Sequence, residues 1–151
     1  MGKDDIKIQA VKGQLPSSLF KEVLDLYASV FEDADLAFFT NRLKENQDAY
    51  ILLAFSCNKL IGFKIGYPYN KDTFYSWIGG VLPSFIKKGI SSKLLNNQEL
   101  YAKELGFKKM RTKSMNRFKP MMILNLINNY NIVKIYTNSK QQTKIVFEKT
   151  L

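Results

Sequence analysis

One short segment of the sequence carries residues whose types and spacing suit the binding of an anion. Pro83 stops an apolar run, and Gly89 then lets the chain turn tightly into an amphipathic run. The N–H groups at the start of that second run, from about residue 89 to residue 93, would have no carbonyl partners inside a helix and would lie at the positive end of its dipole. Lys87 and Lys88 add positive charge beside them. The segment therefore predicts a turn that binds phosphate oxygens. A strand that simply ends before a helix, with no ligand, is the alternative interpretation.

The elements that must position this turn follow from the hydrophobic periodicity of the chain. Apolar residues alternate with polar ones, or run continuously, in short segments that we expect to be strands. These segments are residues 5–11, 50–56, 59–67, 73–82, 107–114, 131–137 and 143–151. Other segments predict helices at residues 16–30, 90–105 and 120–126, and a further helix begins near Asp33 or Asp35. The order β-α-α-β-β-β-α-β-α-β-β predicts an α/β (α+β) fold in which helices flank a mixed, mostly antiparallel sheet.

The same periodicity predicts which side chains two of the helices bury. The helix that begins near residue 35 should bury Leu36, Phe39 and Leu43. The long helix should end at Gly106, because a glycine commonly lies just past the last helical residue. The apolar face of that helix consists of Ile90, Leu94, Tyr101 and Leu105.

Composition limits the classes of protein to which the chain can belong. Its 151 residues, 46% of them hydrophobic, suit one domain over residues 1–151 with a buried core. The absence of histidine excludes Ser-His-Asp and Cys-His catalysis and most zinc sites, so we expect no metal. Cys57 is the only cysteine, which suits a reducing compartment. No apolar run approaches the roughly 20 residues of a membrane span, and the N-terminus lacks the apolar core of a signal peptide, so we expect a soluble cytoplasmic protein.

The net charge of +10, from 23 basic and 13 acidic side chains, favours an anionic partner of some kind. Nucleic acid, a polyphosphate ligand and an acidic protein all satisfy that preference, and scattered surface lysines explain it without any partner. No nucleic-acid-binding motif is present, so we do not expect a nucleic acid to be the partner.

The segment around Gly89 resembles the pyrophosphate-binding loop of the GNAT superfamily of N-acetyltransferases. That loop follows the pattern V-x-P-x-x-[RQ]-x-x-G-x-[GA], and Val81, Pro83 and Gly89 match it. The resemblance extends from about Tyr50 to the C-terminus, and RTKSMNRFK with MMILNL beyond it is similar to a bacterial subgroup with no assigned substrate. It implies a GNAT fold and acetyl-CoA as cosubstrate. The cofactor-binding residues that we expect are Gly80, Val81, Lys87, Lys88, Gly89, Ile90, Ser91, Ser92 and Asn116.

The resemblance also implies a mechanism. In the family, the fourth and fifth strands separate and the pantetheine arm lies between them, in contact with an Asn that corresponds to Asn116. A backbone N–H near Val81 would polarise the thioester carbonyl, which the primary amine of an acceptor would attack directly. Gly79 and Gly80, just before the loop, fit a strand with a bulge or a closely approaching ligand.

The sequence departs from the family's pattern at several positions. Ile86 replaces the usual Arg or Gln of the loop, and Ser91 replaces its second Gly or Ala. The tyrosine that commonly protonates the departing thiolate corresponds to Asn125, whose amide has no useful proton to give. Trp77 occupies the position of a Glu that often serves as the general base. The catalytic residues are therefore unknown at this stage.

Substitutes for the missing acid and base can be named, each with a structural alternative. Tyr75 and Tyr130 are candidates for the proton donor. The acids near plausible acceptor positions are Glu32, Asp33, Asp35 and Asp72. Asp33 and Asp35 also suit helix caps, Asp72 also suits a turn, and an ordered water could carry the proton instead.

Two further groups of residues are candidates for an acceptor surface. Aromatic residues could form an acceptor pocket or simply pack on strand faces. They are Tyr67, Tyr69, Phe74, Tyr75 and Trp77. A basic stripe around the fifth predicted strand could receive the 3′-phosphate of CoA or an acidic acceptor, or could simply face solvent. It consists of Arg111, Lys113, Arg117 and Lys119.

The leading hypothesis is an acetyl-CoA-dependent N-acetyltransferase that acts on the amine of a small molecule or a protein. The alternative is a GNAT-fold module that binds acyl-CoA with little or no turnover, which Asn125 and Trp77 keep open. Exchange of C-terminal strands, which is common in this fold, would make a homodimer.

Overall fold

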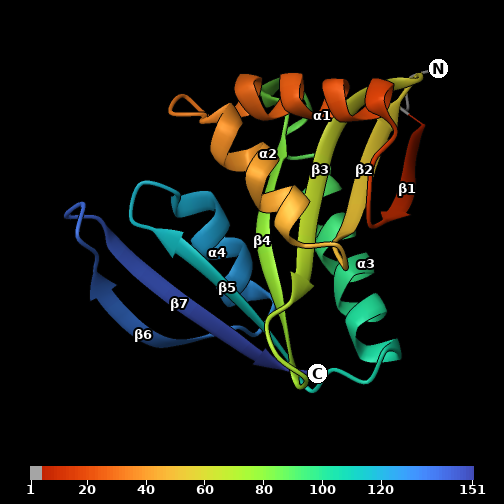
Figure 1. Cartoon of the computed structure of the whole chain (residues 1–151). Helices are drawn as coiled ribbons and strands as arrows, with labels where there is room; N and C mark the ends of the chain where they lie inside the picture. Colours follow the sequence, from red (N-terminus) through yellow and green to blue (C-terminus); the bar gives the residue numbers. More distant parts are fainter. Residues whose placement is uncertain (1–4) are drawn as a thin grey trace. The chain divides into compact units, whose positions relative to one another are not determined.

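A computed structural model describes residues 5–151 of the chain, coloured along the sequence in Figure 1. Its strands are β1 Ile6–Lys12, β2 Tyr50–Ser56, β3 Lys59–Pro68, β4 Thr73–Val81, β5 Lys109–Met115, β6 Asn131–Thr137 and β7 Thr143–Thr150. Its helices are α1 Ser17–Val30, α2 Leu36–Glu45, α3 Ile90–Glu104 and α4 Lys119–Ile127, with a short 3₁₀ helix at Pro83–Phe85. The predicted order of strands and α-helices is confirmed.

The strands form a seven-stranded sheet in the order β1-β2-β3-β4-β5-β7-β6. The pairs β1–β2, β2–β3, β5–β7 and β6–β7 are antiparallel, whereas β4 and β5 are parallel. A parallel pair needs a crossover connection, and α3 provides it between β4 and β5. The prediction of a mixed, mostly antiparallel sheet flanked by helices is therefore confirmed.

Contacts within the chain group it into two compact units. The first contains the chain up to Tyr67 together with Ile78–Gln98, and so holds β1 to β3, α1, α2, the end of β4 and the first part of α3. The second contains Pro68–Trp77 and Glu99–Leu151, and so holds the start of β4, the end of α3 and all elements from β5 onward. The expected single domain over residues 1–151 stays a prediction.

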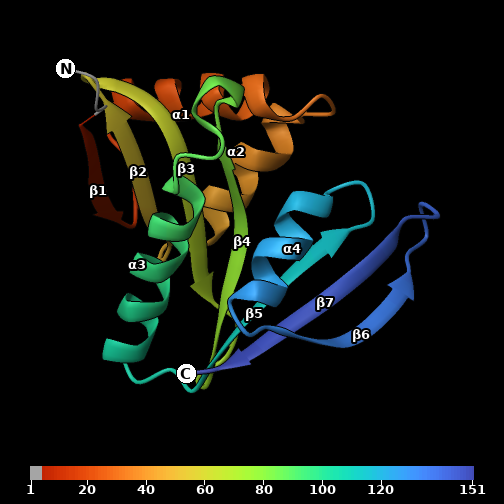
Figure 2. The same ribbon diagram turned by 180° about the vertical axis from the view of Figure 1, so that it is seen from behind.

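The core of the first unit forms on both faces of β2 and β3. Both strands are rich in apolar residues, and nearly all of their side chains are buried, as expected for strands covered on both faces. In Figure 1 α1 and α2 lie in front of these strands, and Figure 2 shows the first part of α3 on the opposite face. The ring of Phe39 on α2 stacks on Tyr27 of α1 with centroids 4.5 Å apart, and meets Phe63 of β3 edge-on at 6.3 Å. These rings fix both helices against the sheet.

The strands of the second unit are covered by helices on one face. Figure 2 shows α4 lying over β5. Phe74 of β4 packs edge-to-face against Tyr101 and Phe107, with ring centroids 6.0 Å and 5.5 Å apart. Cross-strand pairing places the buried side chains of Met110 and Phe147 on the same face as Phe74. The core of this unit therefore lies on the helical face of the strands.

Two apolar side chains that we expected to be buried are exposed. Leu36 is 47% exposed because it is the first residue of α2, directly after the capping Asp35, and Phe39 is the buried residue of that helix. Leu105 is 56% exposed because α3 has already ended, and Gly106, with a φ of 92°, turns the chain off the helix axis. Within residues 5–151, no helix is long and apolar enough to cross a membrane.

Candidate functional site

The turn between β4 and α3 follows a path set by backbone hydrogen bonds and by two residues of unusual conformation. Directly after β4, the N–H of Leu82 donates to the carbonyl of Ile61 at 2.8 Å. Lys87 and Gly89 have φ values of 72° and 76°, in the left-handed region that L side chains rarely adopt. The turn predicted at Gly89 is thus present, and α3 begins at the next residue.

Both ends of this turn pack over Gly62 of β3. A β-carbon at Gly62 would lie 3.3 Å from Cγ2 of Val81 and 3.5 Å from Cγ2 of Ile90. Val81 ends β4, Ile90 begins α3, and both side chains are buried. The absence of a side chain at Gly62 therefore lets the end of the strand and the start of the helix lie close together on β3. No sequence motif marks this role, because the contact joins segments that are distant along the chain.

The first turn of α3 leaves several backbone N–H groups without an acceptor. The first hydrogen bond of the helix runs from the N–H of Lys93 to the carbonyl of Gly89, at 3.1 Å. The N–H groups that precede it, and that donate to no acceptor among the described residues, are those of Gly89, Ile90, Ser91 and Ser92. The expectation that the unpaired groups extend to Lys93 is wrong, because a helical N–H bonds to the carbonyl four residues earlier and Gly89 supplies it.

The positive end of α3 carries no carboxylate of its own. The first turn of this helix contains no acidic residue. In α2, by contrast, Asp35 caps the helix and accepts a 3.0 Å hydrogen bond from the N–H of Phe38. Lys87 and Lys88 precede α3 and are exposed. An anion at this turn would therefore meet both N–H donors and lysine charge.

The space beside Gly89 is open. A β-carbon built at Gly89 would meet no other heavy atom within 4 Å, and the residue is exposed. A ligand group can therefore approach the backbone of the turn directly. This openness distinguishes Gly89 from the glycines of the neighbouring strand.

Gly79 and Gly80 are explained by packing within the first unit. A β-carbon at Gly80 would lie 2.7 Å from Cγ1 of Val30, and one at Gly79 would lie 3.1 Å from the carbonyl oxygen of Phe63. The C-terminal end of α1 and strand β3 thus occupy the space that side chains would need. Neither glycine requires a ligand to account for it.

Asn116, in the second unit, lies directly after β5, where the resemblance places it. It is exposed, and its backbone carbonyl accepts a 2.8 Å hydrogen bond from Nζ of Lys119. Its side-chain amide forms no hydrogen bond with the described residues and is available to a ligand. Its role in cofactor binding stays a prediction.

The parallel ladder between β4 and β5 covers only the start of each strand. It runs from the pair Thr73 and Lys109 to the pair Ser76 and Thr112, where Oγ1 of Thr112 also donates to the carbonyl of Ser76 at 2.9 Å. Beyond Thr112, β5 continues to Met115 in register with β7. The pairing between β4 and β5 therefore ends at Ser76 and Thr112.

Tyr130, itself buried, belongs to a partly buried hydrogen-bond network that the sequence did not reveal. Its hydroxyl donates to Oε2 of Glu99 at 2.8 Å, and Nζ of Lys149 donates to Oε1 of Glu99 at 2.8 Å. Burial, and after it the negative charge of Glu99, raises the pKa of Tyr130 far above its usual value. A phenol held in this way is a poor proton donor at neutral pH, which argues against Tyr130 as the acid.

Among the other candidate acids and bases, some have a structural role in the fold and the rest stay candidates. Asp35 is a helix cap, and the carbonyl of Asp72 accepts hydrogen bonds from the N–H groups of Lys108 and Lys109 in a turn, so the structural interpretation holds for both. Glu32 and Asp33 are exposed. Asn125 is only 4% exposed on α4, and its carbonyl accepts a 2.9 Å hydrogen bond from the N–H of Tyr130. Tyr75 stays a candidate donor.

The residues expected to form an aromatic pocket do not all lie together, and neither do the residues expected to form a basic stripe. Phe74 lies in the core, and Tyr67 belongs to the first unit, where its hydroxyl accepts a 2.8 Å hydrogen bond from Nη1 of Arg42. Arg117 lies over the ring of Phe118 at 4.6 Å, and Lys119 bonds to the turn after β5. The members that stay together on one strand face are Tyr75, Trp77, Arg111 and Lys113.

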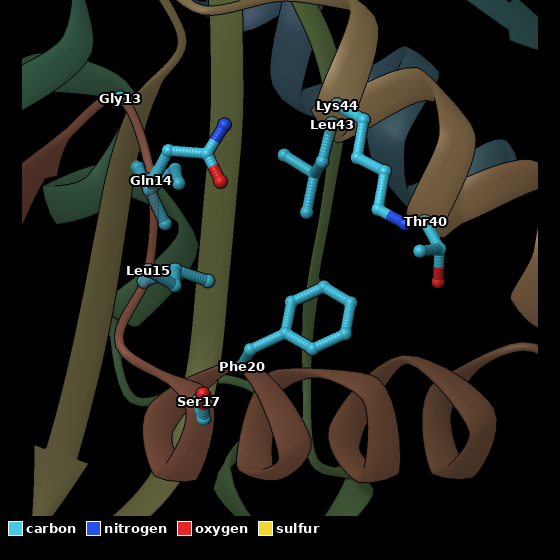
Figure 3. Close-up of a pocket in the computed structure, with 9 residues that line it drawn as sticks. Gly13, Gln14, Leu15, Ser17, Phe20, Thr40, Leu43 and Lys44 are labelled. Carbon is cyan, nitrogen blue, oxygen red and sulfur yellow. The ribbon is translucent and has the colours of Figure 1, made fainter.

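A cavity that the sequence did not predict lies in the first unit (Figure 3). Its volume is about 210 Å³, and it lies between the start of α1 and the second half of α2. Its lining combines the apolar side chains of Leu15, Phe20, Leu43 and Ile51 with the polar side chains of Gln14, Ser17, Thr40 and Lys44. It is at the opposite end of α1 from Val30, which packs against Gly80 beside the turn.

Comparison with known proteins places these features in a family. The chain matches the Acetyltransferase (GNAT) family over residues 17–118. No protein of curated function matches it in sequence. In the part of the chain that the structure describes, no group of three or more His, Cys, Asp or Glu residues could hold a metal ion.

Solved structures with the same fold include several acetyltransferases. A GNAT family acetyltransferase from Elizabethkingia anophelis with acetyl-CoA bound is 21% identical, with a TM-score of 0.80 over 99% of this chain and 100% of that chain. The ribosomal-protein-S18-alanine N-acetyltransferase from Escherichia coli is 11% identical, with a TM-score of 0.79 over 95% and 94%. Arabidopsis thaliana NAA60 in complex with acetyl-CoA is 17% identical, with a TM-score of 0.77 over 97% and 99%.

Proposed function

Because the chain belongs to the GNAT family of acetyl-CoA-dependent acetyltransferases, we propose that it transfers the acetyl group of acetyl-CoA to a primary amine of a small molecule or a protein. The acceptor nitrogen attacks the thioester carbonyl carbon, a C–N bond forms and the C–S bond breaks. The amine loses one proton, and the departing thiolate gains one. The group that accepts the proton from the amine need not be the group that donates a proton to the thiolate.

The observation that supports this proposal is the open N-terminus of α3. The N–H groups of residues 89–92 have no acceptor among the described residues, and the first turn has no carboxylate. Gly89 leaves the space beside them open, and Lys87 and Lys88 add charge. We assign the pyrophosphate of acetyl-CoA to these groups, because phosphate oxygens accept from unpaired N–H groups at a positive helix end.

Two further residues take part in this proposal. The exposed side-chain amide of Asn116 would pair with the polar groups of the pantetheine arm. A backbone N–H near Val81 would donate to the thioester oxygen as negative charge develops on it. An alkyl ammonium has a pKa near roughly 10.4, so the acceptor must lose its proton before attack, and we assign that step to water because no described carboxylate has a demonstrated role in it.

A module that binds acyl-CoA with little turnover is the second candidate. Asn125 cannot protonate a thiolate, and the hydroxyl of Tyr130 is held by Glu99. These two observations favour slow release of CoA. They do not affect the unpaired N–H groups at the start of α3, so both candidates should bind CoA. Only the transferase should release CoA rapidly in the presence of an acceptor.

The test is thiol release from acetyl-CoA measured across a panel of amines and peptides, together with calorimetric binding of CoA. Release that depends on both the enzyme and an acceptor supports the transferase. Tight CoA binding without release on any acceptor supports the module. Absence of both release and binding would rule out both candidates.

A further inference from the structure

One face of the strands in the second unit carries an unbalanced set of charges. This is the face opposite the helices, and cross-strand pairing defines its members. Arg111 pairs with Glu148, Val146 lies between Lys113 and Lys134, and Tyr136 pairs with Lys144. The charged members of this face on β5, β6 and β7 are the cations Lys109, Arg111, Lys113, Lys134 and Lys144 and the single carboxylate Glu148. We call this set the basic face.

The carboxylate of the basic face is already occupied. Nη1 of Arg111 lies 2.6 Å from Oε2 of Glu148, and Nζ of Lys109 lies 3.5 Å from its other oxygen. No described carboxylate lies within ion-pair distance of the three remaining lysines, which are Lys113, Lys134 and Lys144. Their charge is therefore available to a partner.

Two of these lysines converge on one aromatic ring. Nζ of Lys113 lies 5.6 Å from the ring centroid of Tyr136, and Nζ of Lys134 lies 5.3 Å from the same centroid. Each ammonium gains from the ring, but the two like charges repel each other with no carboxylate between them. An anion bound at this point would relieve the repulsion.

Aromatic side chains flank the cations toward β4. Tyr75 pairs with Arg111 in the parallel ladder, and Trp77 lies on the same strand face two residues later. The guanidinium of Arg111 also lies 5.1 Å from the ring centroid of Tyr69. The basic face thus offers rings for apolar contact beside lysines for charge.

We propose that the basic face binds an acidic polypeptide segment, and that such a polypeptide carries the acceptor amine. This inference rests on the proposed function, whose acceptor it specifies. The positive face is complementary in charge to a segment with several carboxylates. Lys109 and Lys113 are about 13 Å apart along β5, and Lys113 and Lys134 are about 10 Å apart across two strands, from standard strand spacings. These are backbone spacings, and cations spread over three neighbouring strands suit an extended segment with several carboxylates better than a single anion.

The position of Trp77 allows binding to be measured directly, because it is the only tryptophan in the chain. The probe is a peptide with a free N-terminal serine followed by alternating aspartate and glutamate, with no aromatic residue. The reference peptide has asparagine and glutamine in place of the acids. We expect the acidic peptide to change Trp77 fluorescence with an affinity at least about tenfold higher than the neutral peptide, and the difference to shrink with added salt.

A pair of charge-reversed variants tests the residues themselves. Lys113→Glu combined with Lys134→Glu should weaken binding of the acidic peptide at least about tenfold and raise its KM as an acceptor, with kcat retained. Lys103→Glu combined with Lys108→Glu makes the same change in net charge at exposed positions of the same unit, outside the basic face. This control should alter binding by no more than about twofold.

The inference is overturned if the neutral peptide binds as well as the acidic one, or if the control loses as much affinity as the variant. Tighter binding of a single-stranded oligonucleotide of equal charge would overturn the assignment to a polypeptide. Binding of CoA is measured on the same proteins. If CoA binds, another amine gives acceptor-dependent thiol release and the peptide results fail, the inference falls and the proposed function stands. If CoA does not bind the wild type, the proposed function itself falls.

Discussion

Tyr130 donates its hydroxyl hydrogen to Glu99 at 2.8 Å, which ties the residue before β6 to the C-terminal half of α3. Lys149 of β7 bonds to the other oxygen of the same carboxylate. The hydroxyl is buried, so this network acts as a structural link within the second unit. It also removes one phenol from the candidates for proton donation.

Tyr130→Phe should make the folded protein less sensitive to alkaline pH. Burial raises the pKa of Tyr130 in the folded state above the value of 10.0 that it has when unfolded. The resulting stability is present below pH 10 and is lost as the pH rises above it, by up to about 1.4 kcal/mol per pH unit. Urea unfolding of both proteins between about pH 9 and pH 11 measures the difference. Parallel curves for the two proteins would show that this hydroxyl does not control alkaline stability.

Asn116→Ala should lower the affinity for CoA, whereas Asn125→Ala should lower the stability of the fold. Asn116 is exposed and its amide is unpaired with described residues, so its loss should weaken CoA binding, measured by calorimetry, and leave the melting temperature unchanged. Asn125 is buried, so its loss should lower the free energy of unfolding by about 1–3 kcal/mol and leave CoA affinity nearly unchanged. Equal loss of CoA affinity in the two variants would refute the assignment of Asn116.

Gly62→Ala should shift both ends of the turn between β4 and α3, because both ends pack over Gly62 of β3. The new β-carbon would lie 3.3 Å from Val81 and 3.5 Å from Ile90, so the end of β4 and the start of α3 must move apart slightly. We expect a loss of about 1–2 kcal/mol in unfolding free energy and a weaker affinity for CoA. Chemical denaturation and calorimetry on the same sample measure both quantities. Unchanged CoA affinity in a destabilised variant would separate the packing over Gly62 from the binding site.

Local sequence patterns predicted the helices and strands, but they could not predict contacts between segments that are distant along the chain. Pro83 and Gly89 marked the turn because each acts on its own backbone, and apolar periodicity located the helices and strands for the same reason. The role of Gly62 depends on two side chains that approach it from other segments. The basic face depends on register, including the irregularity between Ile132 and Lys134 on β6, which decides which side chains share a face.

The binding of CoA at the start of α3 is the central claim, and thermal unfolding tests it without knowledge of any acceptor. A ligand at about 100 times its Kd stabilises the folded state by roughly 2.7 kcal/mol, which corresponds to about 5–10 °C for a chain of this length. Gly89→Glu places a bulky anion where the pyrophosphate should bind. Gly106→Glu is the matched control, because Gly106 also has a positive φ and open surroundings but lies at the other end of α3.

The melting temperature of these three proteins, with and without millimolar CoA, is therefore the most direct measurement. Both substitutions should lower the melting temperature of the free protein, because each replaces a glycine with positive φ. We expect CoA to raise the melting temperature of the wild type and of Gly106→Glu by several degrees, and to leave Gly89→Glu unchanged. If CoA does not shift the wild type, or shifts Gly89→Glu as much as Gly106→Glu, the turn at Gly89 is not the pyrophosphate site.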